Sequence, residues 1–226
     1  MDKRSLVFAS AAGAFLLLSV YLYHYQLYMA LSYCLWVLIF MSLMAFVTHR
    51  KLDAEEIIIM AALAAIAAVG RTIFAPLPSI QPVSFIVICT AVVFGGRTGL
   101  MVGMLSAFVS NLFLGQGPWT LWQMLAWGLM GLTAGLLFYK RNHSKAAKMI
   151  FGFIAGIMFG WIMNLWYLVS YIDSVSWAGI LLAYGASFFM DLLHGLSNVV
   201  FIALFADSLE KILIRIRNKY GILDRA

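Results

Sequence analysis

The chain has 226 residues, of which 64% are hydrophobic and 11% are charged, and its mean hydropathy is +0.97. Because a soluble domain carries about 25% charged residues, this composition excludes a soluble globular enzyme and predicts a membrane protein. The net charge of +6 would suit a nucleic-acid partner, but the Lys and Arg residues stand in short clusters between apolar runs. The sequence has no basic stripe interleaved with aromatic residues, which argues against nucleic-acid binding.

The apolar runs predict an all-α integral membrane protein of about eight transmembrane helices, since about 20 apolar residues cross the hydrocarbon layer as a helix. The runs are residues 5–23, 30–48, 55–74, 82–95, 98–114, 120–138, 149–171 and 178–206. The fourth and fifth runs are short, and the Gly-Gly-Arg turn between them favours two helices over one broken element. After the last run, residues 207–217 mix Leu and Ile with Lys and Arg, which predicts an amphipathic continuation of the helix at the membrane surface.

The distribution of positive charge predicts the orientation of the chain. If the N-terminus is cytoplasmic, fourteen of the fifteen Lys and Arg residues fall in cytoplasmic segments and only Arg71 falls outside. This bias indicates an even number of spans with both termini in the cytoplasm. Because the exterior loops are short, we expect the function to lie within the bilayer, at its outer rim or in a partner.

Two outer segments cannot be helix interiors. Residues 74–82 (FAPLPSIQP) contain three prolines within seven residues, which predicts either a structured lid or hairpin or a simple turn. Residues 115–118 (GQGP) form a second corner, and Trp119, Trp122 and Gln123 follow it on one helix face. These three side chains fit either an interfacial aromatic belt or a stacking platform with a hydrogen-bonding amide.

Polar side chains gather at the outer ends of the predicted helices. A charge at mid-depth in a membrane costs about 2.5–3.5 kcal/mol, so each polar group there requires a partner or a function. We therefore expect a substrate cavity that opens outward. The expected substrate-binding residues are Arg71, Ser79, Gln81, Asn111, Gln116, Trp119, Trp122, Gln123, Asn164, Tyr184 and Asp191.

In the last run, Asp191, His194 and Asn198 follow at spacings of three and four, so they share a helix face. This pattern fits a polar seam in which Asp191 pairs with a cation or an amide of a neighbouring helix, and Arg71 is the natural cation. It also fits the acid and base of an intramembrane enzyme. A metal site is not expected, because one His and one Asp supply too few ligands.

Two stripes of small residues permit close contact between helices. They are Ala61, Ala65 and Ala68 in the third run, and Gly152, Gly156 and Gly160 in the seventh. We expect the glycines to pack within the chain, and the alanines either to do the same or to form a face for another protein. Cys34 and Cys89 lie in apolar runs without Cys or His at metal-ligand spacing, so both are expected to be buried thiols.

Over about residues 54–210 the chain resembles the substrate-binding S-components of energy-coupling factor (ECF) transporters. The resemblance rests on the polar last helix and on three stretches: AALAAIAAVGR near 61–71, FAPLPSIQPVS at 74–84 and FGGRTGLMVGMLSAFVSNLFLGQGPWTLWQM at 94–124. It implies a six-helix core at residues 51–226. Residues 1–50 would then be a two-helix membrane appendage that the family core lacks.

The resemblance also implies a function. S-components capture a vitamin or related micronutrient outside a prokaryotic cell and join a membrane module of one transmembrane coupling subunit and two ATPases. The residues that the resemblance assigns are Ala61, Ala65 and Ala68 for contact with the coupling subunit, and Pro76, Pro78 and Pro82 for the gating loop around 75–81. The chain is not expected to be an enzyme, because the partners hydrolyse ATP and the sequence has no Gly-rich phosphate loop.

The GQGPW-T-x-WQM stretch looks most like the S-components associated with cobalamin and related corrinoids. A pocket of Trp, Gln and Asn suits the neutral amides of a corrinoid, and it suits a flavin or another flat heterocycle equally well. We expect no cofactor of the chain's own, a cobalt corrinoid being bound as substrate. The alternative classes are the intramembrane enzyme and a secondary carrier, for which the sequence lacks a convincing internal repeat.

Overall fold

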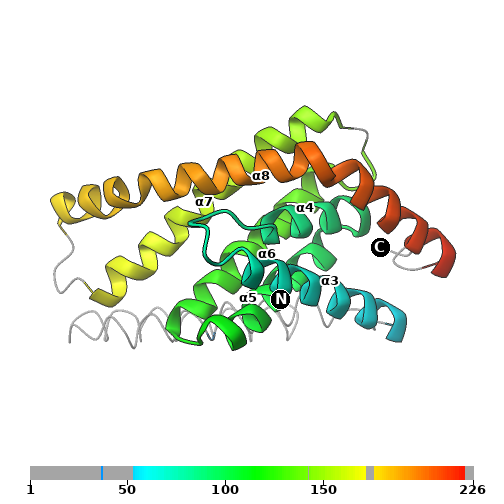
Figure 1. Ribbon diagram of the computed structural model, residues 1–226, viewed down its shortest axis with the longest axis horizontal. Coiled ribbons are helices and arrows are strands. Elements are labelled where there is room, and N and C mark those ends of the chain that lie inside the picture. The colour runs from blue at the N-terminus through cyan, green and yellow to red at the C-terminus, as the bar shows by residue number, and fades with distance from the viewer. Residues whose placement is uncertain (1–36, 38–52, 142, 172–175, 222–226) are drawn as a thin grey trace, which may run out of the picture. The chain divides into compact units, whose positions relative to one another are not determined.

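The computed structural model describes residues 37, 53–141, 143–171 and 176–221, and within these ranges all regular structure is helical. Figure 1 shows the six helices, which are α3 (Ala54–Ile73), α4 (Val83–Phe94), α5 (Gly96–Leu114), α6 (Pro118–Phe138), α7 (Lys145–Tyr171) and α8 (Trp177–Tyr220). They correspond to the last six predicted runs. The runs at 5–23 and 30–48, the appendage at 1–50 and Cys34 lie outside the described residues, apart from Val37.

Five of these helices are long and apolar enough to cross a membrane, namely α3, α5, α6, α7 and α8. Helix α4 has 12 residues, which at 1.5 Å per residue gives about 18 Å, whereas the hydrocarbon layer is about 30 Å thick. The structure therefore supports a multi-pass membrane protein. It does not support the expected count of eight spans, because the run at 82–95 forms too short a helix.

Helix α4 lies at the centre of the packing. All of its residues except Val92 are buried, including Cys89 as expected, and a helix that is apolar on every side belongs in a core. The chain turns from α4 into α5 at Gly95, whose φ of 93° is a conformation that glycine adopts without strain. The prediction of two helices at this point is confirmed.

Helices α5 and α6 lie side by side, with glycines at the contact (Figure 1). A Cβ atom added to Gly131 of α6 would clash with the backbone of Gly99 of α5, and one added to Gly135 would clash with Gly96. Such close backbone approach is available only to very small residues. This contact brings the end of α5 next to the start of α6, where polar residues meet.

The glycine stripe of α7 packs against α8, as expected. A Cβ atom on Gly156 would lie 2.7 Å from the backbone of Gly195, and one on Gly152 would lie 2.6 Å from Ile202. Asn198 of α8 donates a hydrogen bond of 2.9 Å from Nδ2 to the carbonyl of Gly152. The polar face of α8 is therefore turned toward the protein and not toward lipid.

The alanine stripe of α3 is divided between two environments. Ala68 is fully buried, together with Ala64 and Ala67, whereas Ala61 and Ala65 are exposed. The part of the stripe that another protein can reach is thus Ala61 and Ala65.

The proline-rich segment at 74–82 and the glycine-containing segment at 115–118 are not helix interiors, as predicted. No helix is formed between Ile73 and Val83, and residues 115–117 separate α5 from α6, which begins with Pro118 in its first turn. Beyond residue 206 the helix continues to Tyr220, so the predicted continuation is also confirmed.

The described residues fall into two compact units. One consists of residues 53–164 and 184–221, and it contains all the contacts discussed below. The other includes residues 165–171 and 176–183, the adjoining ends of α7 and α8, where Leu165, Trp177 and Leu181 are exposed.

Candidate functional site

Arg71, in the last turn of α3, is the buried cation at the centre of the site, with 8% of its surface exposed. Its Nη1 donates to the Ser110 hydroxyl and to Asn111 Oδ1, both at 2.6 Å. Its Nε donates to Gln81 Oε1 at 3.2 Å. All three acceptors are neutral, so hydrogen bonds solvate the guanidinium without cancelling its charge.

Asn111 extends this arrangement from α5 to α6. While its Oδ1 accepts from Arg71, its Nδ2 donates to Thr120 Oγ1 and to Gln123 Oε1, both at 2.8 Å. Asn111 is 1% exposed, so water cannot reach its amide, and these hydrogen bonds satisfy its polar atoms instead. We refer to the connected residues as the Arg71 network; they are Arg71, Gln81, Ser110, Asn111, Thr120 and Gln123.

A fully buried indole connects the Arg71 network to the core. The guanidinium carbon of Arg71 lies 5.0 Å from the centre of the Trp127 ring, within cation–π range. Trp127 Nε1 donates to the Ser84 hydroxyl at 3.1 Å, and Ser84 is 2.8 Å from His194 Nε2. The ring of Phe159 packs between these groups, at 4.6 Å from Trp127 and 4.9 Å from His194.

The proline-rich segment is fastened at one end. Gln81 accepts from Arg71 through its side chain, and its backbone N–H donates to the Ser197 hydroxyl of α8 at 3.2 Å. Pro82 is buried at the start of α4, whereas Pro76 and Pro78 are exposed. Ser79, which is half-buried and lies between Pro78 and Pro82, has a φ of 57° and so adopts a conformation that is uncommon for a residue with a Cβ atom.

A second polar cluster joins α7 to α8. Asn164 Nδ2 donates to the Ser187 hydroxyl at 2.7 Å, and Ser187 lies 2.9 Å from Asp191 Oδ2. The Tyr184 hydroxyl donates to the carbonyl of Trp161 at 3.3 Å. We refer to Asn164, Tyr184, Ser187 and Asp191 as the Asp191 cluster.

Asp191 was expected to pair with a cation, Arg71, or with an amide of a neighbouring helix, and the pairing with Arg71 is wrong. Asp191 packs against Gly160 of α7 and is connected through Ser187 to the amide of Asn164, whereas the partners of Arg71 come from α5 and the loop. Charge complementarity suggested the pair, but hydrogen bonds to neutral groups satisfy each side chain separately.

The acid–base pair of an intramembrane enzyme is not assembled either. His194 contacts Ser84 and Asp191 contacts Ser187, so the two side chains serve different partners. Among the described residues, no group of three or more His, Cys, Asp and Glu side chains could hold a metal ion.

The expected site residues therefore separate into groups. Arg71, Gln81, Asn111 and Gln123 come together in the Arg71 network, and three others form the Asp191 cluster with Ser187. Trp119 and Trp122 are half-buried in the first turns of α6. Gln116 is exposed; its Nε2 donates to the carbonyl of Phe108 at 3.0 Å, and its Oε1 accepts from Thr120, at the edge of the Arg71 network, at 2.8 Å.

Ser84, Ser110, Trp127 and Ser197 were not among the site residues expected from the sequence. A signal for Trp127 was available, since an indole in an apolar helix needs an acceptor for its N–H. Its acceptor Ser84 stands 43 residues away, and nothing in the sequence pairs the two.

Comparison with known protein families gives one match. Residues 51–214 match the family described as "ECF-type riboflavin transporter, S component". No curated protein and no solved structure matches the chain. The matched range begins just before α3 and ends within α8, so it contains the Arg71 network and the Asp191 cluster.

The Arg71 network is expected to stabilise the fold through Asn111. Asn111→Ala removes one acceptor from a buried guanidinium, and it removes the donor to Thr120 and Gln123. The free energy of unfolding should therefore fall by about 1–3 kcal/mol. Thermal unfolding of the purified chain in detergent measures this loss. The matched variant Asn218→Ala, at an exposed amide near the end of α8, should change stability by less than about 0.5 kcal/mol; equal effects of the two substitutions would contradict the buried network.

Proposed function

Since the chain belongs to the family of ECF transporter S components, it is a substrate-binding membrane subunit and not an enzyme, and we propose that its substrate is a flavin of the riboflavin type. Membership of this family also implies association with the transmembrane and ATPase subunits of the ECF module. The family description names riboflavin, which favours the flavin alternative over the corrinoid expected from the GQGPW stretch; the corrinoid assignment is not confirmed.

The observation that carries this proposal is the set of unused donors in the Arg71 network. Nη2 of Arg71 and the Nε2 atoms of Gln81 and Gln123 make no hydrogen bond to another described residue. The pyrimidine edge of a flavin presents two carbonyl oxygens on either side of an imide N–H. Amide and guanidinium donors that the protein holds in place match such an edge, because each can bind the substrate with its other hydrogen bonds to the protein intact.

The half-buried rings of Trp119 and Trp122 stand in the same first turns of α6 as Thr120 and Gln123. The flat tricyclic ring of a flavin offers a large surface for stacking on an indole, and stacked aromatic pairs gain about 0.5–1.5 kcal/mol beyond their burial. We propose that these indole rings stack on the flavin ring while the Arg71 network donates hydrogen bonds to its polar edge.

The segment from Phe74 to Pro82 is proposed as the lid. Its exposed part, around Pro76 and Pro78, can move, while Gln81 fastens its other end to both Arg71 and Ser197. In this mechanism the same guanidinium binds the substrate and fastens the lid. The positive-charge bias supports an orientation with this end of the bundle outside the cell and both termini in the cytoplasm.

The coupling subunit is proposed to dock on the exposed face of α3 at Ala61 and Ala65. Small residues on a lipid-facing surface let another helix approach closely. ATP hydrolysis in the partners would then reorient the loaded subunit and release the substrate inside.

The substrate class can be tested by identifying the small molecule that remains bound to the purified chain. Cells grown with a mixture of vitamins should yield detergent-purified protein that, on denaturation, releases riboflavin close to one per chain, identified by absorbance and mass spectrometry. Binding should need no ATP, because the chain has no ATPase. Release of a corrinoid would overturn the flavin assignment while keeping the class, and a requirement for ATP in binding would contradict the S-component role.

The docking face is tested by Ala65→Leu in cells that also produce the ECF module. Overpacking a close helix contact costs about 1–3 kcal/mol, so riboflavin uptake should fall about tenfold while riboflavin binding by the purified variant is unchanged. Ala186→Leu is the control, since Ala186 is also exposed but on α8. Full uptake by the Ala65→Leu variant would exclude this face as the contact.

A further inference from the structure

A pocket of about 240 Å³ lies at the other end of the bundle from the Arg71 network. It is bounded by the C-terminal ends of α4 and α6, by the segment before α7 and by α8. Thr120 and Phe138 mark the two ends of α6, and their 18-residue separation corresponds to about 27 Å. The pocket is thus remote from the proposed flavin site, and it is smaller than the roughly 300–1,000 Å³ of pockets for drug-sized ligands.

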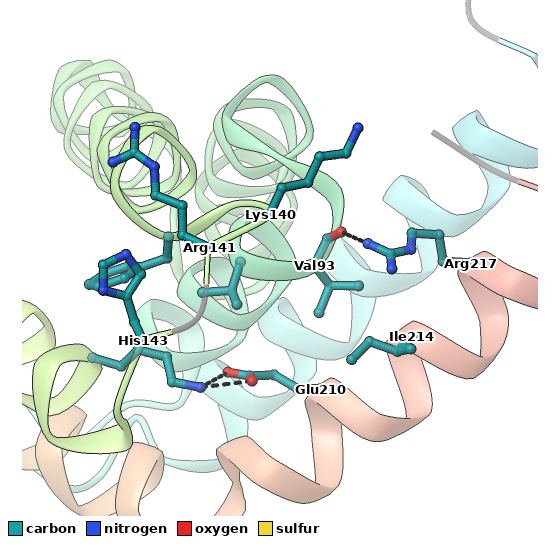
Figure 2. Close-up of a pocket in the computed structure, with 10 residues that line it drawn as sticks. Val93, Lys140, Arg141, His143, Glu210, Ile214 and Arg217 are labelled. Atoms are coloured by element: carbon teal, nitrogen blue, oxygen red, sulfur yellow. Dashed lines mark hydrogen bonds and ion pairs between the residues drawn. The ribbon is translucent and has the colours of Figure 1, made fainter. Parts of the chain in front are cut away.

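The rim of this pocket is cationic. Figure 2 shows Lys140, Arg141 and His143 on one side and Glu210, Ile214 and Arg217 of α8 on the other. Lys148 binds both oxygens of Glu210 at 2.7 Å, so the carboxylate that lines the pocket is already neutralised. The exposed side chains of Lys140 and Arg141 therefore contribute a positive potential that no other lining carboxylate offsets.

Local geometry positions the basic residues at the rim of the pocket. Lys140 has a φ of 55° and directly follows the end of α6, which turns the chain sharply there. Arg217 Nη1 donates to the carbonyl of Val93 at 3.0 Å, close to the C-terminus of α4, where a cation is favoured. Lys140 and Arg141 are exposed, so a ligand can reach both of them.

The floor and surroundings of the pocket are apolar. Val93 and Phe138 are buried beneath it, while Leu136 and Leu137 of α6 are 65% and 46% exposed next to it. In a membrane protein, such exposed side chains face acyl chains. A ligand with an anionic head and hydrocarbon tails would contact both surfaces, whereas a carboxylate of a protein partner would use the rim alone.

We propose that this pocket binds a phosphate group, supplied by the head group of an anionic phospholipid. Basic pockets between transmembrane helices on the cytoplasmic side attract anionic head groups, and the positive-charge bias favours the orientation in which this end of the bundle faces the cytoplasm. The site would fix α4, α6 and α8 together at the inner surface. It does not depend on which vitamin is bound at the other end.

The test is native mass spectrometry of the delipidated full chain in detergent, titrated with phosphatidylglycerol, phosphatidylcholine or inorganic phosphate. Phosphatidylglycerol should bind one per chain, and more tightly than zwitterionic phosphatidylcholine. In the double variant Lys140→Gln/Arg141→Gln, its affinity should fall about 25-fold, roughly fivefold for each charge removed. Competition by inorganic phosphate at comparable concentration would support the phosphate site with free phosphate as its source.

The matched control is the double variant Lys211→Gln/Arg215→Gln, which removes two exposed positive charges of α8 that do not line the pocket. This variant should keep the affinity for phosphatidylglycerol, and thermal unfolding should be unchanged in both double variants because all four substituted residues are exposed. Equal binding of the two lipids, or an equal loss in the two double variants, would overturn the proposal. A loss of lipid binding with normal riboflavin binding would leave the proposed function intact.

Discussion

The structure depends on one buried guanidinium. A charge within a membrane-spanning bundle is tolerated only when hydrogen bonds replace its water. Arg71 meets this requirement with neutral partners from the loop and from α5, and Asn111 then carries the network to α6. Because none of these partners is a carboxylate, the positive charge remains available to a ligand, and the same side chain connects three helices and the non-helical segment at 74–82.

Close packing of helices makes this arrangement rigid. Glycines at the α5–α6 contact bring the backbones together, so Asn111 and Gln123 meet although they lie on different helices. The glycine stripe of α7 does the same for α8 and places Asp191 against Gly160. In a bilayer the hydrophobic effect does not drive helices together, so small residues and interhelical hydrogen bonds must supply the specificity.

Much of the fold could be predicted from the sequence, because hydropathy and the positions of prolines determine where helices form and end. The bounds of α3 and α5–α8, the non-helical segment at 74–82 and the glycine stripe of α7 were all predicted. Within the site, Arg71 and Asn111 were recognised as polar groups in an apolar environment. Their actual partners were not, since a helix face does not reveal which neighbour it meets: Arg71 was a candidate partner of Asp191, and the indole of Trp127 was overlooked.

The central claim is that the Arg71 guanidinium binds the substrate, and the affinity of Arg71→Met for riboflavin tests it most directly. Hydrogen bonds to a charged group contribute about 1.5–3 kcal/mol, so affinity should fall roughly tenfold to a hundredfold and dissociation should accelerate as the lid loosens. Arg97→Met, at the exposed start of α5, is the matched control and should bind normally. A folded Arg71→Met chain with wild-type affinity would contradict the account.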